Sequence, residues 1–191
     1  MIHQIATIIM ASGAEIKIEL YPEAAPNTAT SFMYLASTGA YKNRTIKRVV
    51  PGFVLQPSYT SFDKDPSCDF LIDNESRVNG YDNNLTLSKY AVAMGGDGES
   101  LASGSCFYIV VGDAMEKLDG KYPGFGRVIS GFEEIERIMQ VDTTPVTVDV
   151  PGVVVNEPTR PEIIKDITLE TFGLPIGEPV KTEGILAYER K

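Results

Sequence analysis

The chain has 191 residues, which suits one domain, and 43% of them are hydrophobic against 23% charged, as in ordinary globular proteins. Its 26 acidic and 17 basic side chains give a net charge of −9, which disfavours binding to nucleic acid or to an anionic membrane surface. A Ser-His-Asp triad, a Cys-His dyad or a multi-His metal site would have to rest on the single histidine, His3. Cys68 and Cys106 form no CxxC pair, so the sequence predicts neither a disulfide scaffold nor a zinc site.

The sequence has no feature typical of a membrane or exported protein. No apolar run approaches the roughly 20 residues that span a bilayer. The N-terminus lacks the basic region that begins a signal peptide. We therefore expect a cytoplasmic monomer that binds neither nucleic acid nor membrane and uses no metal or cofactor.

The first forty residues predict a β-hairpin followed by a helix. Apolar side chains alternate with smaller or charged ones from Ile5 to Ile9 and from Glu15 to Leu20, with a turn at Ser12-Gly13. Asn27 is a good N-cap for a helix whose apolar residues fall on one face, and Gly39 is a natural stop after it.

Strands interrupted by polar segments are predicted in the middle of the chain. Two β-branched runs flank Pro51-Gly52, whereas residues 57–84 are polar, irregular and acidic. Such a long irregular segment is either a functional loop or a solvated acidic surface loop, and both interpretations stay open. Residues 95–105 are rich in Gly and Ser and predict a further loop. The strand patterns cover residues 45–56, 85–94 and 107–111.

The last third predicts a helix, an extra hairpin and a final strand. Ser130 and Glu133 have the spacing of a capping box before a short helix. Valine-rich runs on both sides of Pro151-Gly152 predict a hairpin over 146–155, which we place in an insertion at 141–161. The last strand is expected over 163–172. The tail at 174–191 is rich in Pro, Gly and charge, so we expect it to lie on the surface or to be partly disordered.

These elements predict a mainly β protein. Roughly eight short strands and two short helices, one near each end, favour a closed eight-stranded antiparallel β-barrel capped by two short α-helices. The barrel domain is expected over 1–173, followed by the tail.

Several motifs first suggest chemistry, but each lacks a required part. The loop at 95–104 has no GK[ST] and no helix pattern after it, which argues against phosphate binding. Residues 63–69 begin like an EF-hand loop, but Cys68 stands where Gly is needed and Asn74 where Glu is needed. No GxSxG elbow is present. Cys106 begins an apolar strand, which favours a buried structural thiol.

Arg48 lies in an otherwise apolar run, Val49 to Leu55. An arginine in such a place must be satisfied by partners or lie at a pocket wall. Two interpretations follow: a structural ion pair, or a donor beside an apolar surface that binds a ring next to an amide. Counting in twos places Phe53 and Leu55 on one side of the strand and Val54 and Gln56 on the other.

Beyond these features, the chain resembles the cyclophilins, a family of peptidyl-prolyl cis-trans isomerases. The similarity extends from about Ile5 to Gly173 in collinear order, and we expect a divergent member of bacterial origin. It is carried by the motifs IKIELYPEAAPNTATSFMYLAS, RTIKRVVPGFVLQ, GSCFYI, LDGKYPGFGRV, FEEIERI and IIKDITLETFG.

The resemblance implies a set of site residues. The family's catalytic arginine falls on Arg48, its proline-pocket phenylalanine on Phe53, and the glutamine that orients the arginine on Gln56. The substrate-binding positions fall on Val54, Cys106, Tyr108, Leu118 and Tyr122.

This sequence departs from the family pattern around that pocket. Lys47 replaces the usual histidine before the arginine, and Cys106 replaces a glutamine. Tyr122 stands in place of a histidine, Lys117 in place of a frequent tryptophan, and Pro57-Ser58 in place of two glycines. Tyr108 keeps the ring of a phenylalanine.

The function implied by the resemblance is rotation about X–Pro bonds in peptides and folding proteins, with proline-containing peptides or unfolded proteins as partners. One alternative is a cyclophilin-like module that binds Pro-containing segments with little catalysis, which the departures favour. A second is an interaction protein whose acidic segment 57–84 docks a basic partner.

Overall fold

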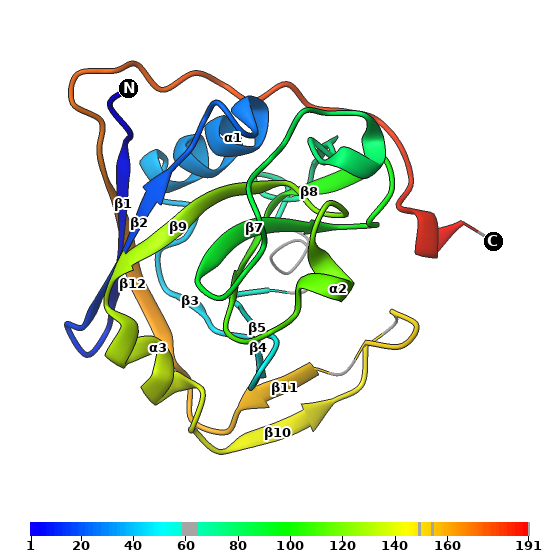
Figure 1. The fold of residues 1–191 in the computed structure, drawn as a ribbon. Coiled ribbons are helices and arrows are strands. Elements are labelled where there is room, and N and C mark those ends of the chain that lie inside the picture. Colours follow the sequence, from blue (N-terminus) through cyan, green and yellow to red (C-terminus); the bar gives the residue numbers. More distant parts are fainter. Residues whose placement is uncertain (59–64, 149, 154, 191) are drawn as a thin grey trace.

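The computed structural model describes residues 1–58, 65–148, 150–153 and 155–190. Its body is a strongly curled antiparallel sheet (Figure 1). The sheet has ten strands in the order β3-β12-β1-β2-β9-β7-β8-β5-β4, with β6 paired to β8. The strands are β1 (Ile5–Met10), β2 (Glu15–Leu20), β3 (Arg44–Thr45), β4 (Arg48–Val50), β5 (Val54–Gln56), β6 (Leu71–Asp73), β7 (Ala91–Gly96), β8 (Leu101–Val110), β9 (Gly124–Ser130) and β12 (Ile163–Glu170).

Three α-helices and a separate hairpin complete the fold. They are α1 (Pro26–Ser37), α2 (Met115–Leu118) and α3 (Phe132–Ile138), together with the 3-10 turns η2 (Arg77–Asn79) and η3 (Ala187–Glu189). The strands β10 (Thr143–Val146) and β11 (Val155–Pro158) pair only with each other (Figure 1). Among the described residues, none of the helices has the length and apolar character needed to cross a bilayer.

The core lies inside the curled sheet, beneath α1. In β1 and β2 every second side chain is buried, as the alternating pattern predicts. Phe32 of α1 packs edge-on against Phe107 of β8, with ring centroids 5.1 Å apart, and also contacts Tyr41 and Phe125. This aromatic cluster fixes α1 against the strands that carry the site.

The mainly β class predicted from the sequence is confirmed, with differences of detail. A third helix, α2, is present. The hydrogen-bonded order ends at β3 and β4, and in the described part of the chain no ladder joins these two strands, so full closure of the barrel stays a prediction. A hairpin is present, but its strands are β10 and β11, so the predicted span 146–155 contains only the pair Val146–Val155 and otherwise connects the two strands; residues 149 and 154 lie outside the described residues.

Both predicted helix caps are wrong. The N-cap of α1 is Ala25, and the side chain of Asn27 instead bonds the backbone of Val180 in the tail. The N-cap of α3 is Gly131 at a φ of 88°, because the backbone turns in the left-handed region between β9 and the helix. The C-terminal stop of α1 at Gly39, with a φ of 79°, agrees with the prediction.

The polar segments contain more regular structure than predicted. Leu101–Ser105 belongs to β8 because it pairs with β6 and with Gly96, so the loop is shorter than 95–105. Residues 57–84 include β6 and η2. Residues 59–64, which include Asp63 and Lys64 of the EF-hand-like motif, lie outside the described residues. Strand β7 begins only at Ala91, and β12 ends at Glu170.

Candidate functional site

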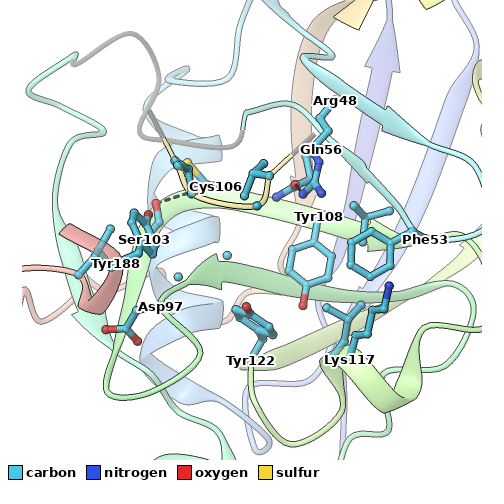
Figure 2. Close-up of a pocket in the computed structure, with 18 of the residues that line it drawn as sticks. Arg48, Phe53, Gln56, Asp97, Ser103, Cys106, Tyr108, Lys117, Tyr122 and Tyr188 are labelled. Carbon is cyan, nitrogen blue, oxygen red and sulfur yellow. Dashed lines mark hydrogen bonds between the residues drawn. The ribbon is translucent and has the colours of Figure 1, made fainter. Parts of the chain in front are cut away.

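One cleft of about 1300 Å³ is lined by all eight residues that the sequence indicated. They come from the β4–β5 hairpin, from β8, and from the segment that begins at α2. The lining positions are Arg48, Phe53, Val54, Gln56, Cys106, Tyr108, Leu118 and Tyr122. Figure 2 shows most of them facing a common space.

Arg48 and Gln56 are cross-strand partners in the β4–β5 hairpin. The turn between them closes through Phe53, whose amide donates to the Val50 carbonyl at 2.9 Å, and needs a positive φ of 77° at Gly52. Because paired residues project to the same face of a sheet, both side chains reach the cleft. Arg48 Nη1 donates to Gln56 Oε1 at 2.7 Å, a charge-assisted bond that orients the guanidinium (Figure 2).

Two cationic side chains, Arg48 and Lys117, lie beside Phe53 in the cleft. Burial lowers the pKa of Arg48, which nevertheless keeps its charge because an arginine remains protonated in proteins. The Arg48 guanidinium carbon lies 5.6 Å from the centre of the Phe53 ring, and Lys117 Nζ lies 5.5 Å from the same centre. Cations at this distance are attracted to an aromatic face. Phe53 is therefore held between two positive groups.

The apolar side of the cleft is a small hydrophobic cluster separate from the main core. Val54, Tyr108 and Leu118 are its buried members at the cleft, while Phe53 and Tyr122 are partly buried and pack on it. Tyr108 and Tyr122 meet edge to face with centroids 6.1 Å apart. These groups give the cleft an apolar wall, which suits the binding of a compact apolar ring.

Phe53 does not follow the predicted alternation. It packs with Val54 in the cleft cluster, whereas Leu55 points into the main core. The reason is that β5 begins only at Val54, so Phe53 belongs to the preceding turn and is not bound by the strand's period of two. Gln56 and Val54 do share the cleft side, as predicted.

Cys106 lies in β8 next to the Arg48–Gln56 pair and is only 2% exposed. Its amide donates to Ser103 Oγ at 3.0 Å, and burial raises the pKa of its thiol. The thiol is therefore protonated and acts as a small wall group, not as a nucleophile. Cys68 is buried too, and the two cysteines do not form a disulfide with each other.

Segments outside the predicted site also line the cleft, and two of them come from the last quarter of the chain. One is the hairpin tip at 150–153, and the other is the tail, through residues 181–184, Leu186, Tyr188 and Glu189. The β10–β11 hairpin forms an ion pair with the residue that precedes β4: Lys47 Nζ lies 3.2 Å from Oε1 of Glu157 in β11. No pattern in the sequence relates these segments to the pocket, although Tyr188 stands out as an aromatic residue in a polar tail.

Comparisons with known proteins agree with this geometry. The family model described as "Cyclophilin type peptidyl-prolyl cis-trans isomerase/CLD" matches residues 5–168. The chain is 35% identical over 125 residues to peptidyl-prolyl cis-trans isomerase B of Bacillus subtilis, covering 65% of this chain and 83% of that protein. It is 33% identical over 131 residues to peptidyl-prolyl cis-trans isomerase-like 3 of Rhizopus delemar, covering 66% and 76%.

Solved structures show the same fold. The crystal structure of a Cryptosporidium parvum cyclophilin type peptidyl-prolyl cis-trans isomerase matches with a TM-score of 0.69 and 24% identity, over 89% of this chain and 99% of that one. A second structure of that protein, in the presence of the dipeptide Ala-Pro, matches with a TM-score of 0.66 and 24% identity, over 87% and 99%.

Proposed function

We propose that Arg48, Phe53 and Gln56 catalyse X–Pro isomerisation in this protein, because the chain belongs to the cyclophilin-type family of peptidyl-prolyl cis-trans isomerases. The cleft binds the proline of an X–Pro bond. Val54, Cys106, Tyr108, Leu118 and Tyr122 form the remaining binding surface. The Arg48–Gln56 bond of 2.7 Å beside an apolar wall is the observation that carries this assignment.

The reaction needs neither a nucleophile nor a proton shuttle. The cis and trans forms of an X–Pro bond differ by only about 0.5–1 kcal/mol. A barrier of about 18–20 kcal/mol separates them because the C–N bond has partial double-bond character. An enzyme lowers this barrier by binding the twisted amide more tightly than either planar form.

Arg48 has the position and charge to provide that differential binding. The apolar rings hold the proline, and Arg48 donates toward the prolyl nitrogen, the proline carbonyl, or both. As the amide twists, conjugation is lost and the nitrogen lone pair becomes a better acceptor, so the bond strengthens in the transition state. A charge-assisted bond contributes about 1.5–3 kcal/mol, which corresponds to roughly ten- to a hundredfold in rate.

The partners proposed are proline-containing peptides and unfolded proteins. The solved relative with an Ala-Pro dipeptide supports the peptide, since it shares this fold. A cytoplasmic location and a role in protein folding are part of the same proposal, and two buried cysteines that form no disulfide with each other are typical of a reducing compartment. We propose that the protein acts as a monomer.

The test is cis-trans exchange in a short Ala-X-Pro-Phe peptide, measured by NMR with the wild type, Arg48→Ala and Arg160→Ala. Arg160 is exposed, so its variant is a control for the loss of one positive charge. We expect acceleration by the wild type and the control, and a loss of about ten- to a hundredfold in Arg48→Ala. Wild-type turnover in Arg48→Ala would remove the central role of the arginine. Peptide shifts without acceleration by the wild type would instead support the binding-module alternative.

A further inference from the structure

The C-terminal tail follows a defined path back across the molecule. After β12 it passes α1 and ends in η3 on the opposite side (Figure 1). Asn27 of α1 makes two hydrogen bonds with the backbone of Val180, at 2.8 and 2.9 Å. Thr182 then donates its amide to the Leu71 carbonyl and its hydroxyl to Asp73 Oδ1, both at 2.8 Å. The tail is thus attached to α1 and to β6.

The last part of the tail is fitted against the loop between β7 and β8. A Cβ placed on Gly184 would lie 2.7 Å from Leu101 Cδ1, so the backbone approaches closely there. The Ala187 amide donates to Asp97 Oδ2 at 3.2 Å. Asp97 Oδ1 in turn accepts from the amides of Glu99 and Leu101, which orders the loop under the tail.

This attachment places Tyr188 at the cleft. Figure 2 shows Tyr188 beside Ser103, on the far side of Cys106 from Arg48 and Gln56. Burial raises the pKa of Tyr188 to about 12, so the phenol is uncharged at neutral pH. Leu186, Cys106, Gly95 and Gly96 also line the cleft, and Gly95 lies against Cys106, whose carbonyl oxygen would be 3.1 Å from a Cβ placed on this glycine. A compartment walled by a phenol ring, a thiol and an aliphatic side chain therefore adjoins the proposed proline pocket, and the nearby Asp97 carboxylate is bonded to the backbone amides of Glu99, Leu101 and Ala187.

Resting on the function proposed above, we propose that Tyr188 is a specificity-determining residue: with Leu186 and Cys106 it forms a second substrate compartment for an apolar side chain flanking the proline. The wall comes from the tail, beyond the residues 5–168 that match the family model. Because the tail is held by hydrogen bonds at three places, the wall is preformed and selects substrates without having to order itself on binding.

The test compares peptides within each variant, so that a general change in activity cancels. The reference is Ala-Ala-Ala-Pro-Ala-Ala, and leucine replaces one flanking alanine at a time. In the wild type we expect leucine at one position to raise kcat/KM about three- to tenfold, since part of its additional apolar surface becomes buried. Tyr188→Ala should lose this preference and Tyr188→Phe should retain it. Ile185→Ala is the matched control, because Ile185 is an exposed tail residue outside the cleft lining.

The outcomes separate this inference from the isomerase assignment. If the wild type does not accelerate the reference peptide, the proposed function fails, and the leucine preference is then measured as a ratio of Kd values from NMR shift titrations. Absence of any leucine preference, or its persistence in Tyr188→Ala, overturns the role of Tyr188. Faster turnover of every peptide by Tyr188→Ala also overturns it, because the tail would then obstruct the cleft.

Discussion

Removal of the Glu75 carboxylate should destabilise the protein strongly, although Glu75 belongs to residues 57–84, whose composition is also typical of an acidic surface loop. Its side chain is only 4% exposed. Oε1 accepts from the Asn27 amide at 3.1 Å, and Oε2 accepts from the Thr28 amide and the Thr28 hydroxyl, both at 2.7 Å. Glu75 thus caps the N-terminus of α1 from 47 and 48 residues away.

The magnitude follows from these contacts. Glu75→Ala leaves two helix-terminal amides and a buried hydroxyl without their acceptor, and each such loss costs about 1–3 kcal/mol. Water entering the vacated space would satisfy part of this demand, so we expect a loss of about 3–5 kcal/mol in the free energy of unfolding. Glu75→Gln keeps one acceptor oxygen but loses the charge beside the positive helix end, and should cost about 1–2 kcal/mol.

The assay is urea unfolding followed by circular dichroism, with the m-value checked for constancy. Asp82→Ala is the matched control, because Asp82 is an exposed acid of the same segment and bonds only Asn84 among the described residues. It should stay within about 0.5 kcal/mol of the wild type. If Glu75→Ala matches that control, the carboxylate does not cap α1, and the reasoning from its burial is refuted.

Two further predictions concern a buried phenol and the single histidine. The Tyr108 hydroxyl is buried without a hydrogen-bond partner among the described residues, so Tyr108→Phe should raise the free energy of unfolding by about 1 kcal/mol; a lower melting temperature would contradict this. The pKa of His3 is raised, chiefly by its hydrogen bond to Glu19, so its stabilising effect is full below a pH of about 6.5 and is lost as pH rises through the folded-state pKa. His3→Gln should therefore be less stable than the wild type by about 0.2–1 kcal/mol near pH 6 and equally stable near pH 9, and a difference independent of pH would argue against the ion pairs with Glu19 and Glu23.

Features with a local cause were predictable from the sequence. The β1–β2 hairpin follows from the alternation of apolar and polar side chains on both sides of a Gly turn. The end of α1 at Gly39 follows from the ease with which a glycine adopts the positive φ found there. The residues of the candidate site were assigned through the resemblance to the cyclophilins, on motifs of the β4–β5 hairpin, of β8 and of the segment that begins at α2. The pairing of Arg48 with Gln56 needs only a short turn, so neighbouring sequence is sufficient to produce it.

Features that depend on distant partners were decided only by the tertiary structure. Asn27 has the right chemistry for a cap, but the buried Glu75 carboxylate takes that role, which frees Asn27 to bond Val180 in the tail. Phe53 leaves the alternation because a turn, not a strand, carries it into the cleft. Tyr188 lines the cleft only because the tail is attached to α1, β6 and the β7–β8 loop. Local patterns determine which elements form, whereas the contacts between elements far apart in the chain determine which side chains enclose the cleft.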